Sequence, residues 1–181
     1  NIAEKDRLAT GTFLQRTGRD SYFDARIFKY NSLRVGDDNQ TLPSLVGDVS
    51  FIRRVTPDVI GGQGVLTFDL HSLNRSSGVP FDANGDGVTD GRDMTRATLG
   101  LSWRRQELLT NGMVFGFGAG LTADAISIRQ DNAYPSVITR TTPMVFADLR
   151  WPWVKSATGG HSAQVIEPVV QLIWSKENTE P

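Results

Sequence analysis

The residues with the clearest capacity for chemistry form an acidic stretch in the middle of the chain, from Asp82 to Asp93. Acidic and amide side chains alternate there with small residues in the order D-x-N-x-D-G, followed by five residues and an acid. This order predicts a calcium-binding loop, because calcium takes about six to eight oxygen ligands at about 2.3–2.6 Å. The predicted ligands are the side chains of Asp82, Asn84, Asp86, Asp90 (through water) and Asp93, with the backbone carbonyl of Val88.

The elements around this loop differ from those of the usual calcium-binding helix pair. Gly87 stands where the loop needs a sharp turn, but the closing acid is Asp93 rather than a longer glutamate. The segment 96–103 after it alternates like a strand, so the loop would join two strands. An ordinary solvated turn remains the alternative, since Asp, Asn and Gly all favour turns. Bound calcium would stiffen the loop or bridge it to anionic sugars.

No catalytic group emerges from the rest of the chain. Asp69 and His71 share a strand face, but residues two apart in a strand lie about 7 Å apart, and no nucleophile motif accompanies them. The chain has no cysteine, which excludes disulfides, thiolate zinc sites and cysteine nucleophiles. Glycines at 116, 118 and 120 alternate within a strand and predict a smooth face, not a phosphate loop. We therefore predict no enzyme and no cofactor besides possible calcium.

Alternation of apolar and polar residues is the main signal for the elements that position these groups. Period two over long segments predicts strands with one apolar face. Eight strands are expected, at about 8–16, 21–34, 44–55, 64–74, 94–107, 112–129, 143–154 and 163–175. The apolar face is expected to meet lipid, and its candidates are Leu66, Phe68, Leu70, Leu99, Leu101, Phe115, Phe117 and Leu121.

The lengths of strands and connections favour a membrane barrel. About 9–11 tilted residues cross the hydrocarbon layer, and several predicted strands reach that length. Connections tend to alternate between short and long, as in up-and-down outer-membrane barrels with short periplasmic turns and long outer loops. The four tryptophans include Trp151 and Trp153 at a strand end, where an interfacial girdle would place them. The fold class is thus all-β, an antiparallel up-and-down meander of about eight long strands within a large outer-membrane β-barrel.

Composition narrows the function classes further. The chain has 19 basic and 20 acidic residues, a net charge of -1, which gives no argument for nucleic-acid binding. No apolar run approaches the roughly 20 residues of a membrane helix. The sequence opens at Asn1 without a Met, so residues 1–181 are expected to be a single segment of a barrel domain within a longer chain.

Three segments carry a resemblance to a known family. Residues 148–154 (DLRWPWV) contain an aromatic-proline pair, and residues 164–174 (QVIEPVVQLIW) follow after a glycine-containing turn. Residues 96–105 (RATLGLSWRR) look like a barrel strand of the same family. Together these segments resemble LptD, the lipopolysaccharide-assembly outer-membrane protein also called organic solvent tolerance protein. The resemblance is clearest over about residues 94–175.

The resemblance implies a function in transport rather than catalysis. It implies a very large barrel in the Gram-negative outer membrane that receives lipopolysaccharide from a periplasmic Lpt bridge and delivers it to the outer leaflet. The implied partners are lipopolysaccharide, outer-membrane lipid and the lipoprotein plug LptE. The family's periplasmic jelly-roll domain and cysteines are not visible in this sequence, and no gate residue can be carried over.

Two other functions remain open at the level of the sequence. A complete small outer-membrane barrel with a binding, adhesin or lipid-modifying role fits the strand count, although residues 176–181 are polar and lack a terminal aromatic residue. A secreted calcium-binding β-sandwich would fit the alternation and the acidic loop.

Overall fold

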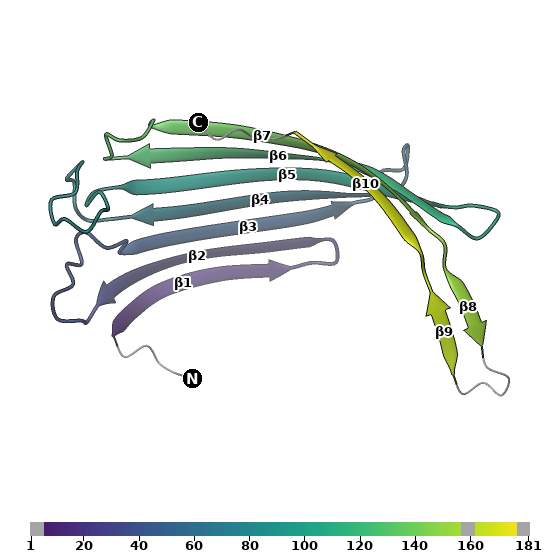
Figure 1. Cartoon of the computed structure of the whole chain (residues 1–181). Helices are drawn as coiled ribbons and strands as arrows, with labels where there is room; N and C mark the ends of the chain where they lie inside the picture. The colour runs from purple at the N-terminus through teal and green to yellow at the C-terminus, as the bar shows by residue number, and fades with distance from the viewer. Residues whose placement is uncertain (1–5, 157–161, 177–181) are drawn as a thin grey trace.

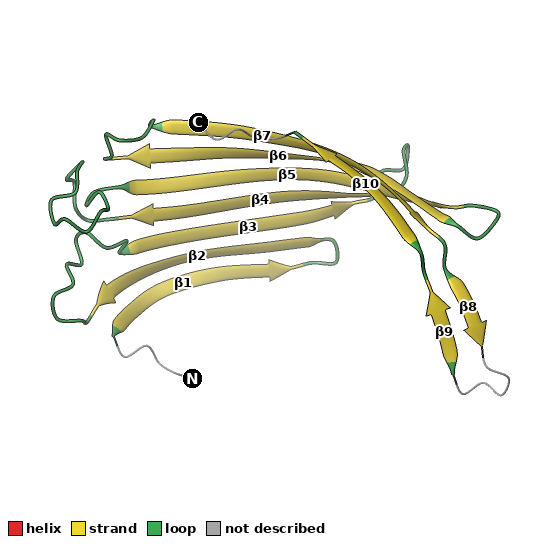
Figure 2. Ribbon diagram, in the orientation of Figure 1, coloured by secondary structure: helices red, strands yellow, loops and turns green. Residues whose placement is uncertain are grey.

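The structure, a computed structural model, describes residues 6–156 and 162–176. These residues form strands but no helix, and hence no apolar helix of membrane-spanning length. Figure 2 shows strands, loops and turns among the described residues. The strands are β1 (Arg7–Thr17), β2 (Ser21–Ser32), β3 (Leu45–Val55), β4 (Gln63–Asn74), β5 (Asp93–Leu108), β6 (Val114–Arg129), β7 (Val137–Arg150), β8 (Trp153–Ser156), β9 (Ala163–Ile166) and β10 (Val169–Ser175).

Eight of these strands form one antiparallel sheet in the order β1-β2-β3-β4-β5-β6-β7-β10, while β8 and β9 pair separately. The sheet is a single curved layer (Figure 1), and β8 and β9 extend beyond it as a hairpin. The connections 18–20, 56–62 and 109–113 lie at one end, which we call the short-turn end. The connections 33–44, 75–92 and 130–136 lie at the other, the long-loop end. The predicted antiparallel meander is confirmed.

The first six predicted strands agree with the structure to within two residues at each end. The seventh, predicted at about 143–154, differs at both ends, because β7 begins at Val137 and ends at Arg150. Residues 137–142 lack apolar alternation, yet they pair along β6 down to Ser127. The carbonyl of Pro143 accepts the N–H of Lys176, just beyond β10. The nitrogen of Pro143 faces the same side, where the pairing of β7 with β10 ends, so β7 tolerates a proline there.

Two prolines divide the last hairpin. The predicted strand 163–175 is broken between β9 and β10 at Glu167-Pro168, and β7 is separated from β8 at Trp151-Pro152. The backbone N–H of Trp151 still donates to the carbonyl of Pro168, 3.0 Å away. Proline cannot donate to a ladder, so two prolines at the same level of a hairpin interrupt the sheet there. The predicted turn around 157–160 lies outside the described residues.

No second layer of described residues covers the apolar face of the sheet. Among the described residues no apolar side chain is buried as a core residue. On the central strands Leu99 and Leu101 remain 50% and 54% exposed. The register places all eight predicted lipid-facing residues on this face: Leu66, Phe68 and Leu70 of β4, Leu99 and Leu101 of β5, and Phe115, Phe117 and Leu121 of β6. A soluble sandwich would bury such a face against another sheet.

Candidate functional site

The opposite face of the sheet is polar and continuous across seven strands. Because directly opposed residues share a face, the register aligns one row of side chains across β1 to β7. This row consists of Gln15, Asp24, Ser50, Asp69, Thr98, Asp124 and Arg140. We call this side the polar face and treat it as the candidate site.

A buried aspartate on β7 is held between two arginines near the short-turn end. Asp148 is 2% exposed. Arg104 of β5 donates from Nη2 to both carboxylate oxygens at 2.8 and 3.0 Å, and Arg150 donates from Nε at 2.9 Å. The Arg104 side chain also lies over the Phe146 ring, 5.7 Å from its centroid. We call Arg104, Asp148 and Arg150 the Asp148 cluster.

A second aspartate on β6 has the same surroundings nearer the long-loop end. Asp124 is 7% exposed and accepts from Arg96 at 2.8 Å and from the hydroxyl of Thr98 at 2.6 Å. Arg140 of β7 approaches the other carboxylate oxygen at 3.3 Å. We call Arg96, Thr98, Asp124 and Arg140 the Asp124 cluster. Each cluster holds one aspartate between two arginines, so each carries a net positive charge.

The polar face over β2 to β4 has the opposite character. Asp24 forms an ion pair with Arg26 at 2.6 Å. Asp48 contacts the Nδ1 atom of His71, and Asp69 accepts from the hydroxyl of Ser50 at 2.7 Å. Asp69 and His71 thus have separate partners on this face. Arg54 of β3 also lies on this face, so three aspartates face two arginines and one histidine. The aspartates outnumber the arginines by one, which makes this half of the face weakly acidic.

Between the two clusters, the polar face runs over the alternating glycines of β6, which have no side chains of their own. A Cβ at Gly116 would lie 2.4 Å from a carboxylate oxygen of Asp148, and one at Gly118 would lie 2.5 Å from the Phe146 ring. Neighbouring side chains therefore lie flat over these glycines. At Gly120 the nearest side-chain atom would be 3.5 Å away, so that position has ordinary space.

The connections at the long-loop end are tied to one another. Arg75 donates from its backbone N–H to Asp93 at 2.8 Å and from Nε to the carbonyl of Thr41 at 2.8 Å. Arg92 pairs with Asp131 and lies 5.1 Å from the centre of the Tyr134 ring. These contacts join the loops 33–44, 75–92 and 130–136 into one ordered end of the sheet.

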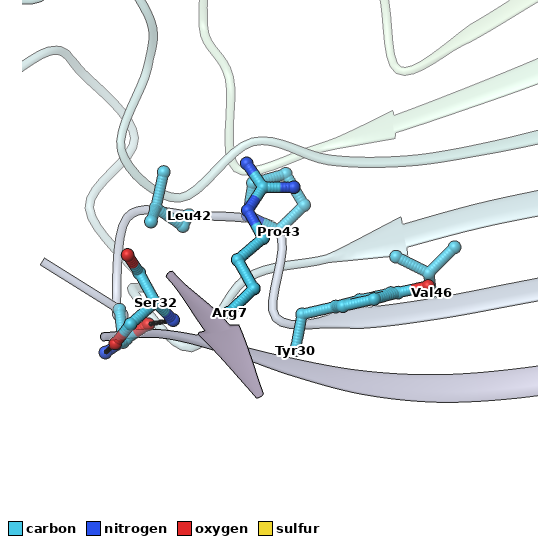
Figure 3. A pocket seen from close by; sticks show the side chains of 7 residues that line it. Arg7, Tyr30, Ser32, Leu42, Pro43 and Val46 are labelled. Atoms are coloured by element: carbon cyan, nitrogen blue, oxygen red, sulfur yellow. Dashed lines mark hydrogen bonds between the residues drawn. The ribbon is translucent and has the colours of Figure 1, made fainter. Parts of the chain in front are cut away.

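A small pocket lies beside the first of these loops. It has a volume of about 230 Å³ and is lined by Arg7, Tyr30, Ser32, Asn39, Leu42, Pro43 and Val46. Figure 3 shows the Tyr30 ring beside Val46 and the Arg7 side chain reaching toward Pro43. Asn39 ties the loop to Ser32 by two hydrogen bonds. Its side-chain oxygen accepts the Ser32 N–H at 2.6 Å, and its side-chain nitrogen donates to the Ser32 carbonyl at 3.1 Å. The loop therefore folds against the polar side of β1 to β3.

The acidic loop belongs to the connection 75–92, at the long-loop end. Asp82 accepts the N–H groups of Gly85 at 2.6 Å and Gly87 at 2.8 Å, and these bonds curl the chain around its carboxylate. Gly87 has a φ of 85°, which confirms the sharp turn expected there. Asn84 accepts the N–H of Asp86 at 2.9 Å. Backbone N–H donors, first that of Gly87, lower the pKa of Asp82 below its usual value.

The second half of the loop lies away from this curl. Asp93 begins β5 and accepts the N–H of Arg75, while Asp90 is 6% exposed and has one carboxylate oxygen without a hydrogen-bond partner. Within residues 6–156 and 162–176, no three acidic, histidine or cysteine side chains are grouped to hold a metal ion. Calcium binding stays a prediction and requires Asp90 and Asp93 to move toward Asp82.

The apolar face gathers aromatic rings toward the short-turn end. Trp103 donates from Nε1 to the carbonyl of Gly61 at 2.9 Å, and its ring meets Phe117 edge-on at 5.4 Å. Phe115 stacks on Phe117 at 5.6 Å, and Trp151 lies 5.0 Å from Trp153. Such a band fits an interfacial girdle, where amphipathic rings meet lipid headgroups.

A comparison with protein families identifies the group to which this two-faced sheet belongs. The model of the family LptD, described as LPS transport system D, matches residues 1–180. The chain belongs to the LptD family. A search of curated proteins finds no match. LptD proteins act in lipopolysaccharide transport at the Gram-negative outer membrane and are a transport family rather than an enzyme family.

Alternation predicted the glycine-rich face of β6, and the register places Asp124 on that same face. The two arginine-flanked clusters were missed, because Arg96, Arg104 and Arg140 reach their partners from other strands. Alternation reveals which face a residue lies on, but only the register reveals which residue lies opposite.

Proposed function

We propose that this chain is a wall segment of an outer-membrane translocon that delivers lipopolysaccharide to the outer leaflet. The observation that carries the proposal is the division of one uncovered sheet into an apolar and a polar face. Lipid cannot satisfy polar side chains, and water does not favour a broad apolar face, so such a sheet suits a boundary between the two. The polar face then lines an aqueous path for the sugar headgroup.

The same reasoning extends to the edges of the sheet. β1 and β10 lie at its two edges, and an open edge in lipid leaves backbone N–H and C=O groups unpaired. We infer that further strands of a longer chain pair with both edges and close a larger barrel. Extending the reading frame on both sides tests this. Several hundred further residues with alternating strands would support it, and stop codons at both ends would favour a complete small barrel.

The partners follow from the proposed role. We propose that the polar face contacts lipopolysaccharide and that the barrel works with the lipoprotein LptE and the periplasmic Lpt bridge. A photo-crosslinking side chain at Thr67, on the polar face, tests substrate contact in the full-length protein in cells. Adducts with lipopolysaccharide at Thr67, and none at Leu66 on the apolar face, support the proposal. Equal labelling at the two positions would contradict it.

We also propose calcium binding by the loop from Asp82 to Asp93. Support comes from the curl of the chain around Asp82 and the unpartnered oxygen of Asp90. Calorimetric titration of the detergent-solubilised full-length protein with calcium tests it, and an outer loop needs a dissociation constant of only about 10⁻⁴–10⁻³ M. Binding should be lost in Asp82→Asn and kept in Asp58→Asn, in the turn 56–62. No heat of binding in the unaltered protein would refute calcium binding.

A further inference from the structure

We propose that the Asp148 and Asp124 clusters are two successive binding stations for the anionic groups of the glycolipid, its phosphates above all. The inference rests on the proposed function and adds the residues that hold the substrate on its way. Both clusters lie on the polar face of β5 to β7, on either side of Gly118 and Gly120 of β6. These two glycines and Gly116 form what we call the glycine strip.

The arginines of both clusters keep contact with solvent while their aspartates do not. The side chains of Arg104 and Arg150 are 40% and 36% exposed, against 1% for Asp148. In the Asp124 cluster, Arg96 and Arg140 are 45% and 36% exposed. A guanidinium has five N–H donors, so each arginine retains donors beyond its contact with the aspartate.

The buried aspartates prepare the arginines for an anion. Ion pairing fixes each guanidinium before a ligand arrives, which lowers the entropy lost on binding. Two fixed guanidiniums match the bidentate geometry of phosphate and carboxylate groups. The aspartate also limits the strength of binding, because it cancels one of the two positive charges. A transport path needs sites that attract the substrate and also release it.

The spacing and the surrounding charge suit a stepwise path. Gly116, which underlies Asp148, is eight residues from Asp124 along β6. At about 3.3 Å per residue the two stations are roughly 26 Å apart. The glycine strip between them carries no bulky side chain of its own. The acidic half over β2 to β4 repels anions and directs them toward β5 to β7.

Photo-crosslinking of the purified full-length complex tests the stations. A photoreactive residue replaces Met144, which lies opposite Gly120, midway between the two clusters. The probes are lipopolysaccharide and the same glycolipid with its phosphates removed. In the variant Arg104→Gln/Asp148→Asn/Arg150→Gln, crosslinking to the phosphorylated probe should fall at least about tenfold, the effect of losing one charge-assisted hydrogen bond.

Matched variants separate binding from a structural role. Asp24→Asn/Arg26→Gln neutralises an ion pair on the same face and should change crosslinking less than about twofold, well below the effect of a lost charge-assisted bond. Asp148→Asn alone keeps a side-chain oxygen that accepts from the arginines and removes the negative charge that cancels one of theirs, so it should raise crosslinking. A role in stability alone predicts no such rise. The dephosphorylated probe should respond to none of these changes.

The outcomes distinguish this inference from the proposed function. If lipopolysaccharide reacts at Met144 but the cluster variants change nothing, or Asp148→Asn does not raise the yield, the stations are refuted while the polar path stands. If the unaltered complex gives no adduct at Met144, the proposed path fails and the stations with it. Heat-modifiable electrophoretic mobility reports the folding of each variant.

Discussion

At the scale of single residues, Asp148 can lie against the polar face because the residue beneath it, Gly116, has no side chain. Asp148 occupies the space that a Cβ at Gly116 would fill, 2.4 Å from its carboxylate oxygen. The glycine therefore lets the carboxylate lie flat on the sheet, within reach of Arg104 and Arg150. Sequence alternation predicted a smooth strip here, but the reason for it became visible only with the strand pairing.

We expect Gly116→Ala to lower the free energy of unfolding by about 1–3 kcal/mol, as overpacking does elsewhere. The methyl group must displace Asp148 and weaken its bonds to both arginines. Gly120→Ala is the matched control on the same strand and face, where a Cβ has ordinary contacts at 3.5 Å. It should be neutral or slightly stabilising. Equal effects in urea unfolding from lipid vesicles would contradict this explanation.

Asp82 gives a pH dependence with a definite sign. The N–H group of Gly87, with that of Gly85, lowers its pKa below the usual 3.8. A carboxylate with a lowered pKa in the folded state stabilises that state fully above 3.8 and loses this effect as the pH falls through the lowered value. The NMR shift of the Gly87 amide should therefore stay constant from neutral pH to 3.8 and change below it. A change centred above 3.8, or one unaltered in Asp82→Asn, would refute the bond.

At the scale of strands, alternation predicted where most strands lie. It did not predict the interruptions at Pro152 and Pro168. The ends of β4 to β6 were predictable because apolar residues mark one face of each of these strands. The beginning of β7 was not, since residues 137–142 are mostly polar and Pro143 suggests an end. Only the missing neighbour on the β10 side explains why proline fits there. Pro168 stands where the predicted strand 163–175 divides into β9 and β10.

Two neighbouring residues of β5 should differ in how much an introduced arginine costs. Leu101 lies on the apolar face and Ser102 on the polar face. Leu101→Arg should cost about 2–4 kcal/mol if it lies at the bilayer midplane, because the charge would face hydrocarbon. Ser102→Arg, facing water, should cost less than about 1 kcal/mol. Reversible refolding into vesicles measures both, and a near-zero cost for Leu101→Arg would contradict its placement in lipid.

At the scale of the whole molecule, the sheet is organised by its two surroundings rather than by a core. No apolar side chain among the described residues is buried, while aspartates on the polar face are. This arrangement inverts the pattern of a soluble domain and agrees with membership of the LptD family. The sequence could predict the two faces from period two. It could not predict the curvature of the sheet or the charged clusters, which depend on pairing between distant residues.

Alternating exposure to lipid is the central claim, and a spin-label scan along β5 tests it most directly. The described chain has no cysteine, so cysteines introduced singly from Thr98 to Trp103 report one position each, with any cysteines elsewhere in the full-length protein replaced. In vesicles, labels at Leu99, Leu101 and Trp103 should collide with dissolved oxygen, and labels at Thr98, Gly100 and Ser102 with a water-soluble nickel complex. A period of two in the ratio of these collision rates is the predicted result. Uniform values, or protection of the leucine positions from both reagents, would contradict the account.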